Sequence, residues 1–324
     1  MRHQLVAFWR PAIDVKRYGR ITTPDRYEED ERAILEYCGR VIRITKRQLE
    51  RHYRWTLNRL DFFFLDKAQA NAAMFQRHDR HAVGVCVGLP FMIKKNLDLA
   101  MRNAEFLEEY LTPQERPEWS MRFLGMIIEH VYLHEAAHAL RGHLLYLRRP
   151  PMSRSLDERR GSLNSYLELD ADLHAVDMWL AITEDSEDFP TRRDLRLDLY
   201  FQRVFTILLL YQTLDCGNRA IAEHMRLDHP APVHRALMLS AAMRQTVPHQ
   251  HRLPAKLVEN THHQAFWEAS VAARTWKLLA DRWWGGTTGR RRGMARYSTV
   301  IRQFLDAIEP QLDAFVETLP NDLV

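Results

Sequence analysis

His134, Glu135 and His138 form an HExxH motif, and residue types at this spacing are suited to zinc-dependent hydrolysis. On an α-helix the two histidines lie about 40° apart and one turn above the other, so both imidazoles can reach one metal ion at roughly 2.0–2.1 Å. Glu135 lies about 100° round the helix from His134, where it can accept a proton from a water molecule held by the metal. The sequence therefore predicts one zinc ion per chain, with Glu135 as the general base.

The motif lies in an apolar stretch, residues 126–147, which contains no proline and predicts a largely buried helix. His143 follows the motif, but the longer HExxHxxGxxH pattern requires a glycine and a histidine where this chain has Arg141 and Leu144. Nine residues beyond His134 is also about half a turn away from the ligand face of a continuous helix. We therefore expect His143 to support the site or to pack beside it, and not to bind the metal.

A second helix, predicted around residues 166–177, offers the third ligand. Glu168 and Asp172 are four residues apart and share one face, whereas the opposite face carries Asp170, His174 and Asp177. Spacing alone does not choose between the two faces. In zinc sites a carboxylate often completes a His/His/Glu set while another carboxylate holds a ligand imidazole. This chemistry favours Glu168 as the ligand and Asp172 as its supporting group, with the opposite face in solvent.

Length and composition are those of an ordinary globular protein. The 324 residues are 46% hydrophobic and 27% charged, which is ordinary for a globular protein with a sizeable core. The three cysteines are scattered without CxxC spacing, which favours a reducing, cytoplasmic location and argues against a thiolate–zinc site. No window of 18 uncharged apolar residues is present, so we expect no transmembrane segment. The net charge of +4 does not require a nucleic acid partner, and the oligomeric state is left open.

The pattern along the chain predicts a mainly helical fold with a small β-sheet, of the α+β class. Helical periodicity runs over residues 26–60 and 91–111, and Val83 to Leu89, closed by Pro90, gives the clearest strand signal. Helical patterns return beyond residue 163. We expect an N-terminal helical region (1–60), a catalytic domain (61–245) and a C-terminal helical region (246–324).

Several separated motifs occur in a recognisable order: Asn71-Ala72, the strand from Val83 to Leu89, HExxH followed by His143, Glu168-xxx-Asp172, and His229-Pro230 to Arg235. In this order they resemble the gluzincin metalloendopeptidases of the HtpX / CAAX-prenyl-protease type. The resemblance covers about residues 61–243. This sequence departs from the family pattern in two respects. Ala137 stands where many members have a glycine, and the transmembrane helices of those membrane proteases are not found. The resemblance therefore implies a soluble branch of the family.

The resemblance implies a zincin-like core with an edge strand beside the active-site helix, and a role for each matching residue. Zinc would be bound by His134, His138 and Glu168, with Glu135 as the base. Asp172 would orient a ligand histidine, His229 would stabilise the oxyanion and Arg235 would hold that region. An extended substrate would pair with Asn71 and with strand 82–88, including Val83 and Val85.

These expectations describe a soluble zinc metalloendopeptidase that hydrolyses peptide bonds of a protein substrate. The alternative is a regulatory binding protein on a protease-like scaffold, whose basic loops hold an acidic protein or a nucleic acid, because a fold does not fix a function.

Overall fold

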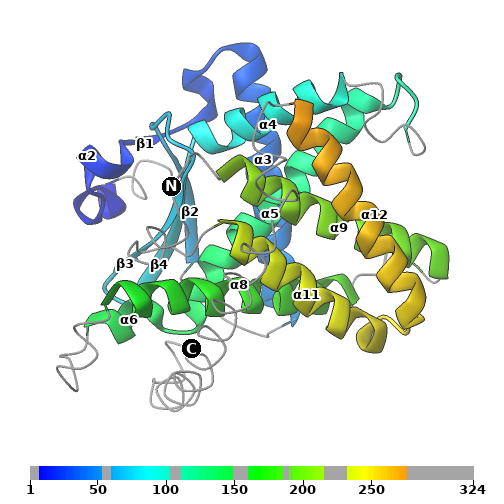
Figure 1. The fold of residues 1–324 in the computed structure, drawn as a ribbon. Coiled ribbons are helices and arrows are strands. Elements are labelled where there is room, and N and C mark those ends of the chain that lie inside the picture. The colour runs from blue at the N-terminus through cyan, green and yellow to red at the C-terminus, as the bar shows by residue number, and fades with distance from the viewer. Residues whose placement is uncertain are drawn as a thin grey trace.

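The computed structural model describes residues 7–52, 60–102, 111–148, 160–184, 190, 192–214 and 232–275. In this part of the chain most residues are helical, and the strands form one small mixed sheet that lies to one side of the helices (Figure 1). The prediction of a mainly helical α+β fold is confirmed. None of the helices in the described ranges combines the length and the apolar character needed to cross a membrane.

The sheet has the strand order β1-β2-β4-β3, so β1 and β3 are its edges. Its strands are β1 (Ile21–Thr22), β2 (Leu60–Leu65), β3 (Ala72–Arg77) and β4 (Arg80–Cys86). β4 runs parallel to β2 and antiparallel to β3, with which it forms a hairpin closed by His78 and Asp79. His78 has a φ of 54°, the left-handed conformation that a two-residue hairpin turn uses.

The sheet is covered on both faces, because side chains alternate along each strand. Val83 and Val85 belong to the main core, whereas Ala82 and Cys86 belong to a smaller apolar cluster on the other face. That second face is covered by N-terminal residues, with Trp9 fully buried among them. A strand buried on both faces has a nearly continuous apolar sequence, which explains the strong strand signal of β4.

The helices pack around α5 (Arg116–Leu140), whose residues from Phe123 to Ala137 are mostly buried. The other long helices are α3 (Glu29–His52), α4 (Gly88–Met101), α8 (Arg160–Glu184), α9 (Arg193–Leu214), α11 (Pro232–Gln250) and α12 (Ala255–Thr275). The short helical segments are η1 (Arg10–Ala12), α2 (Val15–Tyr18), η2 (Pro24–Arg26) and α6 (His143–Arg148). One continuous core includes residues from α3, the sheet and all the long helices, and so from all three regions expected from the sequence.

The apolar stretch of residues 126–147 is two helices, not one. α5 ends at Leu140, and Gly142 adopts a φ of 63° before α6 begins at His143. Glycine takes this left-handed conformation at low cost, so it commonly ends a helix and redirects the chain. The chain beyond Gly142 therefore does not follow the helical wheel of α5.

A buried arginine fixes α9 against α5 and so against the site. The guanidinium of Arg203 forms an ion pair with Glu129, donates to the main-chain oxygen of Met126 at 3.2 Å, and lies 4.3 Å from the ring centre of Trp179. The Arg203 side chain is buried and that of Glu129 is partly buried, so loss of either partner would leave a poorly solvated charge between α5 and α9.

Candidate metal centre

α5 presents the three residues of the HExxH motif on its buried surface. His134 and Glu135 are buried, and Ala136 and Ala137, between Glu135 and His138, have no exposed surface. Small side chains at these positions let neighbouring elements approach α5 closely, and the elements that pack against it include α8 and β3. The local sequence therefore places polar ligand atoms inside a packed environment.

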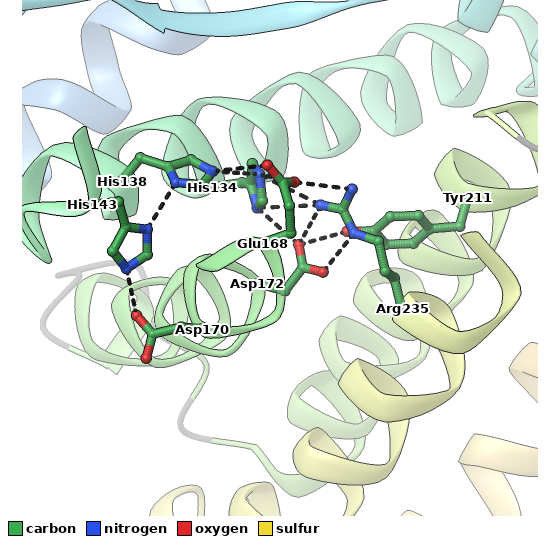
Figure 2. Close-up of polar contacts among 8 residues, drawn as sticks. All are labelled: His134, His138, His143, Glu168, Asp170, Asp172, Tyr211 and Arg235. Atoms are coloured by element: carbon green, nitrogen blue, oxygen red, sulfur yellow. Dashed lines mark hydrogen bonds and ion pairs between the residues drawn. The ribbon is translucent and has the colours of Figure 1, made fainter. Parts of the chain in front are cut away.

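α8 brings Glu168 to the two histidines, as Figure 2 shows. The Nε2 atoms of His134 and His138 are 3.2 Å apart. Glu168 places one carboxylate oxygen 3.3 Å from Nε2 of His134 and the other 3.5 Å from Nε2 of His138. Ligand atoms bound to one tetrahedral zinc ion at about 2.0–2.2 Å lie roughly 3.3–3.5 Å from one another. The three residues therefore have the donor types and the separations of a zinc site.

Asp172 holds the ring of His134. One carboxylate oxygen of Asp172 lies 2.8 Å from Nδ1 of His134, one turn of α8 beyond Glu168. Asp172 is 1% exposed, and its pKa is held well below the usual range because Arg235 and His134 outweigh the effect of burial. An ionised carboxylate only accepts hydrogen bonds, so Nδ1 of His134 carries the hydrogen and Nε2 presents its lone pair to the metal position.

Asp172 is itself fixed by groups from α9 and α11. Arg235 donates through Nε and Nη2 to its two carboxylate oxygens, both at 2.7 Å, and the hydroxyl of Tyr211 donates to it at 2.8 Å (Figure 2). The Arg235 guanidinium lies 4.9 Å from the ring centre of Tyr211 and 3.4 Å from an oxygen of Glu168. Its Nη2 also lies 3.4 Å from both ring nitrogens of His134. Arg235 thus links the third ligand to the carboxylate that orients the first.

The carboxylates around His134 favour a cation at this position. Burial lowers the pKa of His134, but Asp172 and Glu168 outweigh burial and raise that pKa to about 10. The same negative field that stabilises a proton on the ring stabilises a divalent metal ion between the ligands.

His143 contacts His138, the second candidate ligand, directly. The sequence predicted a supporting or packing role for His143 but not this contact. Because the chain turns at Gly142, Nδ1 of His143 lies 2.8 Å from Nδ1 of His138. Its Nε2 lies 2.8 Å from a carboxylate oxygen of Asp170. The estimate that His143 lies half a turn away from the ligands is wrong, since it assumed a continuous helix.

The contacts of His143 determine which nitrogen of His138 faces the candidate metal position. Burial lowers the pKa of His143 to about 4, so its ring is neutral at pH 7. Ionised Asp170 accepts from the Nε2–H of His143, which leaves Nδ1 of His143 as an acceptor. His138 therefore donates from Nδ1, and the lone pair of its Nε2 faces the candidate metal position.

The expectation that the face with Asp170 is solvated is wrong. Asp170 is 5% exposed, and Arg141 donates to its two oxygens at 3.0 and 3.2 Å. Burial raises the pKa of Asp170, but hydrogen bonds from His143 and Arg141 outweigh burial and hold it well below the usual range. His174, on the same face, lies 3.6 Å from Asp170, whereas Asp177 is exposed. A helical wheel could not show this, because the groups that cover Asp170 come from other elements: Arg141 at the end of α5 and His143 of α6.

Replacing His143 by phenylalanine is expected to lower zinc affinity about 10- to 100-fold while leaving one zinc site. The phenyl ring keeps the packing but removes the acceptor that fixes the tautomer of His138. Competition for zinc with a chromophoric chelator measures the effect, and Asp177→Asn on the exposed part of α8 is the control. Wild-type affinity in His143→Phe would show that this contact does not orient the ligand.

A cavity of about 380 Å³ opens beside the three ligands. Its wall includes Glu135 from α5 and residues 70–74, which contain the start of β3. Apolar side chains of Leu89, Val131 and Leu210 form part of its surface. The cavity therefore joins the metal position, the candidate base and one edge of the sheet.

The strand next to the cavity is β3, not the strand predicted from the sequence. β4 is paired on one side with β2 and on the other with β3, and Val83 and Val85 are fully or almost fully buried. An extended substrate cannot pair with a strand whose two sides are both occupied, so the assignment of Val83, Val85 and strand 82–88 to substrate binding is wrong. Asn71, which precedes β3, lines the cavity, and its main-chain oxygen accepts from the amide of Cys86 at 2.9 Å.

His130, which was not predicted as a site residue from the sequence, also lines the cavity one turn before His134. It is 2% exposed, and its Nε2 has no hydrogen-bond partner among the described residues. Burial lowers its pKa to about 3, so the ring is neutral at pH 7. The i, i+4, i+8 spacing of His130, His134 and His138 was the signal that could have revealed it.

The structure therefore brings together His134, His138, Glu168, Asp172 and Arg235 in one network, with Glu135 and Asn71 on the wall of the adjoining cavity. The predicted oxyanion group, His229, lies outside the described residues. Comparisons with models of protein families, with curated protein sequences and with solved structures find no match.

Proposed function

We propose that the protein is a zinc-dependent endopeptidase that cleaves an extended segment of a protein substrate. The observation that carries this proposal is the convergence of a His/His/Glu trio, a buried glutamate and a sheet edge on one cavity. A metal site of purely structural type has no need of a neighbouring general base or of an open cavity. The motif order that resembles gluzincins of the HtpX / CAAX-prenyl-protease type supports the same reaction, with the helices and sheet around the site serving as a zincin-like core.

The two histidines would be held in the correct tautomer by separate carboxylates. Asp172 acts on His134, and Asp170 acts on His138 through His143. Such outer contacts fix the ligand rings and raise their basicity. When bound, zinc supplies Lewis acidity, which lowers the pKa of a water molecule to about 7 and polarises a carbonyl group.

Glu135 would act as the general base. It follows His134 directly on α5, so it lies beside the metal position and not on the ligand face. Its side chain is buried and lines the cavity in which the reacting water and the peptide carbonyl would meet. Glu135 would accept the proton of the attacking water and pass it to the leaving amine.

The edge strand β3 would hold the substrate. One side of β3 pairs with β4, and its other side is an edge of the sheet. An extended peptide can add to such an edge through main-chain hydrogen bonds, largely independently of its sequence. Since residues 70–74 line the cavity, a peptide added there would pass the candidate base.

Removal and return of zinc tests this proposal. Wild-type protein incubated with a mixture of peptides from a digested proteome is expected to produce new termini detectable by mass spectrometry. Treatment with a zinc chelator should abolish them, and stoichiometric zinc should restore them. Cleavage that survives complete removal of the metal would contradict the proposal.

A further inference from the structure

The N-terminal segment, whose role the sequence left open, reaches the cavity. Residues from Phe8 to Ile21 cover the second face of the sheet, opposite the main core. Within this segment the ring of Tyr18 packs edge-on against Phe75 of β3, with ring centres 5.2 Å apart. Arg17 and Tyr18, at the end of α2, line the cavity together with residues 70–74.

Several contacts hold α2 in this position. The side chain of Asp14 accepts from the amides of Lys16 and Arg17 and so caps the helix. Gly19 follows with a φ of 81°, and a Cβ at this position would lie 2.3 Å from the main-chain oxygen of Asp66. Any other residue at Gly19 would strain the backbone and collide with it, so the close approach of α2 to the sheet depends on this glycine.

Arg17 is a cation available to a ligand. Among the described residues, the arginines that line the cavity are Arg17 and Arg235. Arg235 forms ion pairs with Asp172 and Glu168. Arg17 is exposed, and no ion pair links it to another described residue. Its guanidinium lies 5.1 Å from the ring centre of Tyr18, an arrangement that keeps the charge beside the phenol.

Tyr18 adds a hydrogen-bond donor next to this charge. Its side chain is half-buried, and its hydroxyl makes no hydrogen bond to another described residue. Burial raises its pKa above the usual value; the guanidinium of Arg17 opposes this rise and the carboxylate of Glu135 adds to it. The hydroxyl therefore stays protonated and lies within electrostatic range of the candidate base.

A peptide on β3 would present alternate side chains to α2. Along β3, Ala72 and Met74 face the main core with α5, whereas Ala73 and Phe75 face the N-terminal cluster. A strand added to β3 continues this alternation, so every second side chain of the peptide would point towards the side of Arg17 and Tyr18.

We infer that Arg17 and Tyr18 form a subsite that selects a substrate residue with a carboxylate side chain close to the cleaved bond. This inference rests on the proposed peptidase function. A guanidinium matches the planar geometry of a carboxylate, and the phenol donates a further hydrogen bond to it. Aspartate or glutamate at one position should be preferred roughly tenfold over neutral residues, the scale of a hydrogen bond between charged partners.

Charge reversal tests the subsite. A randomised library of C-terminally amidated peptides, in which carboxylates come from side chains alone, is incubated with zinc-loaded wild type, Arg17→Glu and Lys16→Glu. Wild type should favour an acidic residue at one position near the cut, and Arg17→Glu should replace this preference by one for lysine or arginine. Lys16→Glu makes the same charge change on the exposed neighbour, which does not line the cavity, and should keep the acidic preference.

The outcomes separate the subsite from the peptidase function. Cleavage by wild type without an acidic preference, or an unchanged preference in Arg17→Glu, overturns the subsite and leaves the peptidase intact. No metal-dependent cleavage by wild type overturns both. If Arg17→Glu does not fold, as judged by circular dichroism and zinc content, Arg17→Gln takes its place and should lose the acidic preference without reversing it.

Discussion

Glu135→Gln is expected to lower peptide cleavage by about 10²–10⁴-fold while the zinc content stays at the wild-type level. Glutamine has nearly the same shape as glutamate, so the packing of α5 is kept, but its amide cannot accept the proton of the attacking water. Glu135 is not among the three residues whose ligand atoms converge, so the metal should remain bound. The rate is measured with a peptide that the wild type cuts, alongside zinc quantification.

The control for this variant is Glu118→Gln, the same change in the exposed first turn of the same helix. It should leave cleavage unchanged. If Glu135→Gln keeps wild-type activity, another group is the base and the assignment is wrong. If the wild type never cuts a confirmed bound partner and Glu135→Gln retains its cellular effect, the alternative of a regulatory binding protein is favoured.

Glu168→Ala is expected to abolish stable zinc binding, because it removes one of the three protein ligands and the only carboxylate among them. His138→Ala should have the same effect. The two remaining ligands cannot complete a three-residue site, so zinc should be lost during dialysis. Metal content per chain, determined by elemental analysis after dialysis, gives the result.

Asp177→Ala serves as the matched control, since it removes an exposed carboxylate from the same helix. The fold of Glu168→Ala should persist, because Arg235 keeps its two hydrogen bonds to Asp172. A variant that folds and still retains one zinc ion per chain after dialysis would refute the role of Glu168 as a ligand.

The sequence by itself determined which residue types make up the candidate metal site. HExxH and ExxxD are patterns within single helices, where residues four apart share a face through local geometry alone. The converging atoms of His134, His138 and Glu168, and the contact of Asp172 with His134, follow from these two local patterns once the helices pack. The helical content and the β4 strand were likewise visible, because apolar periodicity is also a local property.

The tertiary structure decided everything that depends on which elements meet. Strand pairing joins residues far apart in sequence, so the apolar run of β4 could not show which strands flank it or that β3 is the edge. The left-handed conformation of Gly142 turns the chain so that His143 contacts both His138 and Asp170. A helical wheel of one continuous helix places His143 away from His138. Arg17 reaches the cavity only because Gly19 allows α2 to approach the sheet. These contacts join segments that are separated in the sequence, so the residue pattern within any one segment cannot predict them.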